Sequence, residues 1–216
     1  ASQWANSAPI LFPIVGALKN DTCVINGKEY HMTQHGFARH NEFETNQVSD
    51  TEVIFSLKSN DEIIKQYPFL FELNVTYRLV ENKLKCHIEV KNTDHQPIYF
   101  QVGGHPAFAC PFMENESSND YYLEFSENET CNRKIIDVEK RGMARVEKPF
   151  FDTEKRFFVR QELFNTDAIV IKNFKSENIA LKSLNHDKSI VFHMNGFDHV
   201  GLWAAKHVGG LIAIEP

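Results

Sequence analysis

FELNVTYRLVENKLKCHIEV, residues 71–90, alternates apolar and polar side chains with a period of two in each of its halves. Apolar residues occupy every second position over 71–79 and again over 84–90, and the polar step 81–83 separates the two runs. This pattern predicts an antiparallel hairpin with one apolar face. An apolar face must be covered by another layer, and a second sheet is the simplest cover.

Short strands with similar patterns are predicted along most of the chain. They fall at 52–58, 98–102, 121–125, 168–171, 179–181, 190–194, 200–203 and 211–214. Only 61–67 and 153–164 favour helices, and both are short. Because parallel sheets need a helix between consecutive strands, the pattern favours an all-β fold built as a large antiparallel β-sandwich. The polar run ENESSND at 114–120 predicts an exposed loop.

The composition limits the class of protein. A chain of 216 residues that is 42% hydrophobic can bury one sizeable core, so 1–216 is expected to be a single domain. A net charge of −6 gives no broad positive field, so neither nucleic acid nor a membrane is an expected partner. Four cysteines without a C-x-x-C pair predict reduced, buried thiols and a cytoplasmic location.

Metal and nucleotide sites have little support in the sequence. His31 and His35 are four residues apart, but zinc binding at that spacing needs a helix, and Gly36 favours a loop. No G-x-S-x-G elbow, Walker loop or G-x-G-x-x-G motif follows a strand. The sequence therefore predicts no metal, and its histidines have to be considered one at a time.

Two segments place a titratable residue at the end of a predicted strand. In VGGHPAF, two glycines and Pro106 hold His105 where an imidazole can project; a tight turn with an exposed histidine is the alternative. In GGLIAIEP, Glu215 follows contiguous apolar residues typical of a strand buried on both faces. Burial there would raise its pKa, whereas a solvated strand end would not.

Three further polar residues have a functional and an ordinary interpretation. His35 and Arg39 lie in the loop motif HGFAR, where solvated side chains are the commoner case. Asp167 precedes a predicted strand and could equally form a turn. Trp203 is assigned to the core. Taken one by one, these residues do not establish a function.

Together, HGFAR, GGHPAF, the aspartate before a strand and the terminal IEP resemble the aldose 1-epimerase (galactose mutarotase-like) family. PILFPIVG, YPFLFELNVTYRL and FDHVGLWAAK extend the resemblance along nearly the whole chain. It implies a large antiparallel sandwich, the galactose mutarotase-like supersandwich, with an open cleft for a pyranose sugar. Family members have more strands before PILFPIVG and continue past IEP, so N-terminal strands and a C-terminal tail are expected to be missing.

The resemblance also implies residue roles and a reaction. His105 would be the general acid and Glu215 the general base, flanking C1 and the ring oxygen from opposite sides. His35 would contact the sugar near its ring oxygen, Asp167 would hold hydroxyls, and Arg39 would orient the substrate. The ring would open, rotate and close to interconvert the α and β anomers of a free hexose, galactose or glucose, without a cofactor.

Two alternatives remain open. A hexose-6-phosphate 1-epimerase needs a cationic pocket, and Arg39 and Lys206 are the few basic residues near the motifs. A non-catalytic carbohydrate-binding β-sandwich would keep the cleft without needing His105 and Glu215. Ala17 stands where relatives often have an arginine, and Glu215, next to the last residue, is expected to fray. The oligomeric state is not predicted.

Overall fold

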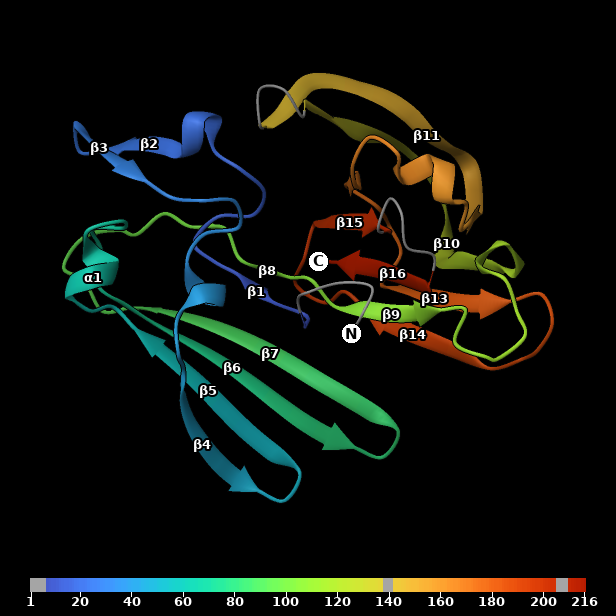
Figure 1. Cartoon of the computed structure of the whole chain (residues 1–216), viewed down its shortest axis with the longest axis horizontal. Helices are drawn as coiled ribbons and strands as arrows, with labels where there is room; N and C mark the ends of the chain where they lie inside the picture. Colours follow the sequence, from blue (N-terminus) through green and yellow to red (C-terminus); the bar gives the residue numbers. More distant parts are fainter. Residues whose placement is uncertain (1–6, 138–141, 205–209) are drawn as a thin grey trace. The chain divides into compact units, whose positions relative to one another are not determined.

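Just over half of the chain, 54%, forms β-strands, mostly antiparallel, and only 8% is helical (Figure 1). The computed structural model describes residues 7–137, 142–204 and 210–216. Two compact units make up the chain: unit 1 is Ala1–Ile10 with Gly103–Pro216, and unit 2 is Leu11–Val102. The described residues form a single α-helix, α1 (Asp61–Ile64), so the predicted all-β fold is confirmed.

Unit 2 is built on a four-stranded antiparallel sheet. Its order is β4 (Glu44–Ser49), β5 (Glu52–Lys58), β6 (Phe71–Val80) and β7 (Lys83–Asn92). The predicted hairpin is β6 with β7, in which Phe71 lies opposite Asn92 and Val80 opposite Lys83. Unit 2 also contains a small hairpin, β2 (Thr22–Ile25) with β3 (Lys28–His31).

The apolar face of the β6–β7 hairpin is covered over part of its length. The rings of Phe12 and Tyr67 lie 4.9 and 5.9 Å from the ring of Phe71, whose side chain is buried. Toward the turn, Leu79 and Leu84 are 55% and 63% exposed. The packing that stabilises the hairpin is therefore concentrated at the open end of the two strands, away from their turn.

Unit 1 contains an eight-stranded sheet. Seven strands follow the order β14 (Ser189–His193), β13 (Asn178–Ser183), β10 (Tyr121–Asp137), β12 (Ile169–Lys172), β15 (His199–Trp203), β16 (Gly210–Glu215) and β9 (Ala107–Cys110). The eighth, β11 (Gly142–Phe158), pairs with β10. Two further short strands are β1 (Ile10–Leu11) and β8 (Gly103–Gly104).

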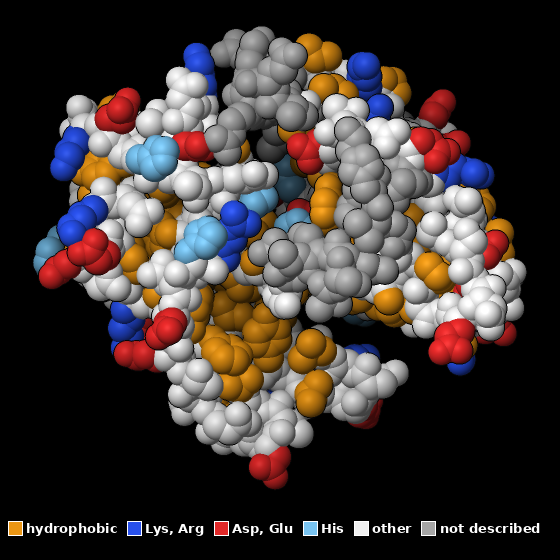
Figure 2. Space-filling model, in the orientation of Figure 1, with side chains coloured by type: hydrophobic (Ala, Val, Ile, Leu, Met, Phe, Trp, Pro, Cys, Tyr) orange, Lys and Arg blue, Asp and Glu red, His pale blue; other side chains and the backbone are white. Residues whose placement is uncertain are grey.

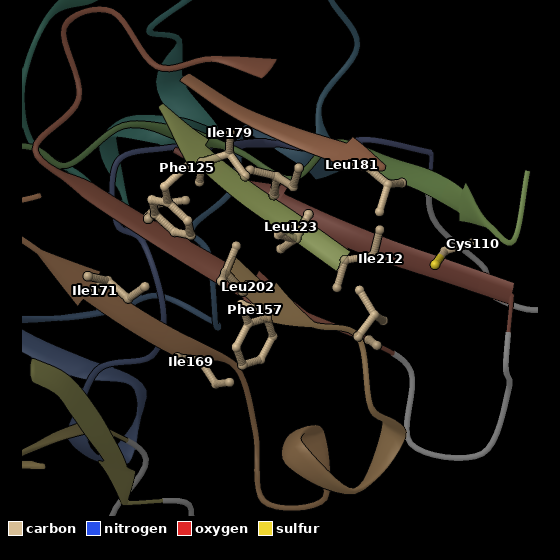
Figure 3. Packing of buried hydrophobic residues seen from close by; sticks show 14 of the residues in the cluster. Cys110, Leu123, Phe125, Phe157, Ile169, Ile171, Ile179, Leu181, Leu202 and Ile212 are labelled. Atoms are coloured by element: carbon tan, nitrogen blue, oxygen red, sulfur yellow. The ribbon is translucent and has the colours of Figure 1, made fainter. Parts of the chain in front are cut away.

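Strand β10 is long enough to have different neighbours at its two ends. Its first half pairs with β13 and its second half with β12, and the register against β11 shifts between Glu124 and Glu129. Such irregularities bend a strand and let it serve two parts of a sheet. The core of unit 1 collects around this bend (Figure 3), with Leu123, Phe125, Ile171, Leu181, Leu202 and Ile212 fully buried.

Two sequence predictions are wrong. The first half of the predicted helix 153–164 is the end of β11, because pairing with β10 overrides local propensity, and only a 3₁₀ turn at Gln161–Phe164 is helical. The predicted strand 98–102 is irregular. Its backbone groups bond to side chains and loops: Tyr67 Oη donates to Tyr99 O at 2.9 Å, and Gln101 N donates to Pro13 O at 2.8 Å.

Other local expectations hold only in part. The run 114–120 is not wholly an exposed loop, because it contains a 3₁₀ turn (Ser118–Asp120) and the Glu116 side chain is only 10% exposed. That carboxylate accepts hydrogen bonds from Tyr121 and Ser183. None of the four cysteines is in a disulfide, but only Cys110 is buried; Cys23 and Cys131 are half-buried and Cys86 is exposed. In the described part of the chain, no helix has the length and apolarity to cross a membrane.

Candidate active site

Strand register places the two predicted proton-transfer residues next to each other in unit 1. β16 runs antiparallel to β9, with Ala213 opposite Ala107. Continuing this register by two residues places Glu215 opposite His105. Directly opposed residues of an antiparallel pair project from the same face, so the side chains of His105 and Glu215 are expected to be neighbours. Figure 1 shows the two strands, β16 and β9, side by side.

The backbone around Glu215 is held by hydrogen bonds on both sides of the residue. Ile214 N donates to Pro106 O at 3.2 Å, and Gly104 N donates to Pro216 O at 3.2 Å. These bonds extend the ladder between β16 and the chain leading into β9. The expected fraying of Glu215 is therefore not found, and its carboxyl group has a defined position.

The side chains of His105 and Glu215 are in contact. His105 Nε2 lies 3.3 Å from Glu215 Oε1, and the two side chains are 12% and 13% exposed. The Trp203 ring packs edge-on against the imidazole, with 5.5 Å between centroids and 82° between planes. The two groups thus lie side by side, rather than on opposite sides of a ligand-sized gap as the sequence interpretation placed them.

The carboxyl group of Glu215 has an unusual protonation equilibrium. Burial raises its pKa to about 8, with a further contribution from the negative charge of Asp167. Asp167 stands just before β12, where its Oδ1 accepts a hydrogen bond from Ala168 N at 2.7 Å. The structure therefore brings three predicted site residues together, and a pKa of about 8 favours the protonated form of the Glu215 carboxyl group at neutral pH over the ionised form.

His35 belongs to unit 2, and its ring is oriented by the PILFPIVG segment. Gly16 N donates to His35 Nδ1 at 3.1 Å, and His35 N donates to Gly16 O at 2.7 Å. Since Nδ1 accepts this bond, the proton of the neutral ring is on Nε2. His35 has φ of +66°, which is uncommon for a residue with a side chain and often marks a functional position.

Gly36 explains the glycine of the HGFAR motif. It has φ of +71° and forms a parallel bridge with Phe12. A Cβ atom at this position would lie 2.2 Å from Phe12 O, which no side chain can accommodate. The glycine thus permits the close approach of two segments and fixes the chain that carries His35.

Arg39 also belongs to unit 2, in the 3₁₀ turn Ala38–His40. Its Nε donates to His40 Nε2 at 3.2 Å, so His40 orients the guanidinium group. A role for His35 and Arg39 in binding substrate stays a prediction. Lys206, the other basic residue considered for a phosphate pocket, lies outside the described residues.

Two residues near His105 and Glu215 were missed as site residues. Gly201 lies opposite Glu215 across β15 and β16, and Trp203, assigned to the core from its sequence, contacts His105. The strand 200–203 was predicted, and its period of two places Gly201 and Trp203 on one face. The sequence did not reveal that this strand, β15, pairs with the C-terminal strand β16.

The candidate site offers an imidazole and a carboxyl group in contact, those of His105 and Glu215. Within 7–137, 142–204 and 210–216, no cluster of three histidine, cysteine, aspartate or glutamate side chains has the arrangement of a metal site. Acidic and basic side chains are interspersed on the face shown in Figure 2, without a broad positive field there. The contacting imidazole and carboxyl group can exchange protons with a bound hydroxyl.

Comparison with known proteins identifies relatives of the whole chain. The family model for aldose 1-epimerase matches residues 2–210. The plasmid-encoded protein LacX of Lactococcus lactis subsp. lactis is 34% identical over 227 residues, covering 99% of this chain and 74% of LacX. A galactose mutarotase related enzyme from Lactobacillus acidophilus has 31% identity and a TM-score of 0.92, with 100% of this chain and 72% of that chain covered. A galactose mutarotase-like protein from Lactobacillus casei has 30% identity and a TM-score of 0.86, covering 100% and 74%.

Proposed function

Because the chain belongs to the aldose 1-epimerase family, we propose that it interconverts the α and β anomers of a free hexose, galactose or glucose. The observation that supports this proposal most strongly is the contact of 3.3 Å between His105 Nε2 and Glu215 Oε1. A site that only bound sugar would not need a buried imidazole and a buried carboxyl group in contact, since burying ionisable groups costs free energy.

The reaction needs one proton removed and another delivered at neighbouring oxygens. The anomeric hydroxyl loses its proton while the ring oxygen gains one, and the C1–O5 bond breaks to give the aldehyde. Rotation about the C1–C2 bond and ring closure then produce the other anomer. Both oxygens are bonded to C1, so an acid and a base in contact with each other can reach both from one side of the sugar.

The reaction needs one proton shared between His105 and Glu215, and that proton can reside on either residue. With one proton between His105 and Glu215, either the carboxyl group or the imidazole can donate while the other accepts. The raised pKa of Glu215 keeps that proton on the pair at neutral pH. When a sugar hydroxyl binds, the carboxyl group passes its proton to the imidazole and exchanges its contact with the imidazole for one with the substrate, so His105 acts as the acid and Glu215 as the base.

Other residues of the site would bind and orient the sugar. The carboxylate of Asp167, close enough to Glu215 to raise its pKa, can accept hydrogen bonds from sugar hydroxyls. Trp203 holds the His105 ring in position by packing against it. That His35 and Arg39 also bind the sugar stays a prediction from the family resemblance.

Polarimetry tests this proposal. Freshly dissolved α-galactose and α-glucose should change their optical rotation faster with the protein than without it. Galactose 6-phosphate and glucose 6-phosphate in the same assay separate the free-hexose enzyme from a hexose-6-phosphate 1-epimerase. Binding of sugar by calorimetry with no acceleration for any of the four would replace the proposal with a non-catalytic carbohydrate-binding protein.

The pH profile of kcat/KM should fall on its alkaline side near the pKa of Glu215, about 8. As the pH rises through that value, the pair loses its last proton and with it the acid, so the rate should drop about tenfold per pH unit. The Asp167→Asn variant removes the negative charge that raises this pKa, so its alkaline limb should begin at a lower pH. The hydroxide-catalysed background is subtracted at each pH; a rate that stays level across the alkaline range would contradict this assignment.

A further inference from the structure

Gly201 occupies a position in unit 1 where a glycine is not required by the backbone. It lies inside β15, with Val170 of β12 opposite on one side and Glu215 of β16 opposite on the other. Its φ angle is outside the left-handed region that favours glycine. Glycine inside a strand weakens it, because the chain loses more conformational freedom on folding and no side chain packs. The absence of a side chain at Gly201 is therefore best explained by the room that it leaves for a neighbouring side chain.

The space beside Gly201 is filled by Glu215. A Cβ atom on Gly201 would lie 3.3 Å from Glu215 Cβ, 3.5 Å from its Oε2 and 3.6 Å from its Cδ. The nearest neighbours of the missing methyl group are thus all in one side chain, and they include the carboxyl group itself. The Glu215 side chain therefore lies against the bare backbone of Gly201, with Oε1 turned toward His105.

We propose that Gly201 is a positioning residue for Glu215: because it lacks a side chain, it leaves the space in which the carboxyl group rests beside His105. For its effect on catalysis, this inference rests on the proposed function. The row across the sheet runs from His105 to Glu215 to Gly201. A methyl group at Gly201 would press the glutamate from one side while the imidazole confines it from the other.

In Gly201→Ala the Glu215 side chain is expected to move only slightly, but its carboxyl group takes part in the proposed reaction. A Cβ contact of 3.3 Å is tighter than most, so the glutamate would shift by a few tenths of an ångström, whereas the other two contacts are ordinary. The backbone accepts alanine without strain, and alanine is favoured over glycine inside a strand. Gly201→Ala should therefore lower activity without lowering stability, a combination that a purely structural glycine would not give.

Kinetics of Gly201→Ala test the inference in the full chain. We expect kcat for anomer interconversion to fall about tenfold with little change in KM, because the misplaced group acts in the transition state. The melting temperature should equal or exceed that of the wild type. In a Glu215→Gln background, the same substitution should cost no further activity, because Gly201 acts through the glutamate carboxyl group. Full activity, a multiplicative loss in that background or a variant that fails to fold would overturn the inference.

A second measurement decides the inference even if the protein does not act on sugars. Carboxyl ¹³C NMR follows the titration of Glu215, whose signal is assigned by its disappearance in Glu215→Gln. Asp167 and His105 are the titratable groups that face this carboxyl group, and both are unchanged in Gly201→Ala. The added methyl group should move the titration midpoint upward, because it excludes more water from the carboxylate. An unchanged midpoint and chemical shift would overturn the inference, whereas absent catalysis by the wild type would overturn only the proposed function.

Discussion

Replacing Glu215 by glutamine is expected to lower kcat for hexose anomer interconversion by about 10²- to 10⁴-fold, the usual contribution of one positioned proton-transfer group. Glutamine keeps the size and packing of the side chain but cannot exchange a proton with His105 or with the sugar. The change is measured by polarimetry with fresh α-galactose at neutral pH, at saturating sugar so that kcat is read rather than binding.

A matched control separates this effect from a general loss of charge. Glu154 lies on β11 of the same unit with an exposed side chain, so Glu154→Gln makes the same chemical change away from the site. It should retain wild-type kcat. If Glu215→Gln retained the wild-type rate as well, Glu215 would not be the base, and the contact with His105 would have another purpose.

The same substitution should raise the free energy of unfolding in alkaline solution. In the folded chain the pKa of Glu215 is about 8, above its ordinary value of 4.5. Below pH 4.5 the carboxyl group is protonated in both states, so it carries no penalty. As pH rises, the unfolded chain ionises first, so wild-type stability is lost progressively until the folded pKa is passed. The loss is at most about 5 kcal/mol, from the size of the shift.

Denaturant unfolding at two pH values measures this difference. Glutamine does not titrate, so Glu215→Gln should match the wild type near pH 4.5 and be more stable than the wild type above pH 8, whereas Glu154→Gln should follow the wild type at both. A Glu215→Gln protein that is equally destabilised at both pH values would mean that the carboxyl group is ionised and satisfied in the fold. That result would contradict the burial argument.

Glu215→Gln is thus expected to lower kcat but to raise the stability of the folded chain at alkaline pH. The buried carboxyl group destabilises the folded chain in alkaline solution, and its raised pKa keeps on the His105–Glu215 pair the proton that the proposed reaction needs. Strained or unfavourable features retained at one position are typical of functional sites. Gly201 fits the same interpretation, because a glycine inside a strand has a stability cost and leaves room for Glu215.

Much of the strand pattern could be predicted from the sequence, and the failures have physical causes. The hairpin β6–β7 follows from alternation, because every second side chain of β6 is buried over the first half of that strand. The predicted strand 98–102 failed because an apolar run does not reveal whether a partner strand lies beside it. The predicted helix 153–164 failed because pairing with β10 decides the structure of β11, and the partner is far away in sequence.

The candidate site was predictable in its residues and not in its arrangement. His105 and Glu215 were identified from strand ends and family motifs, but their contact depends on the register of β16 against β9, which neither segment specifies alone. The sequence left a raised pKa of Glu215 open as one of two alternatives, because burial of the strand end was not established, and the contribution of Asp167 needed the placement of β12. Gly201 was missed because its proposed role depends on the side chain of Glu215, which lies opposite it on the neighbouring strand.

A double-mutant cycle on His105 and Glu215 tests the central claim most directly. His105→Gln, Glu215→Gln and the double variant are compared with the wild type by kcat for α-galactose, after subtraction of the uncatalysed rate. If the two residues share one proton and act as a unit, the double variant should lose no more than either single variant. Losses that multiply, so that each residue contributes independently of the other, would contradict the account.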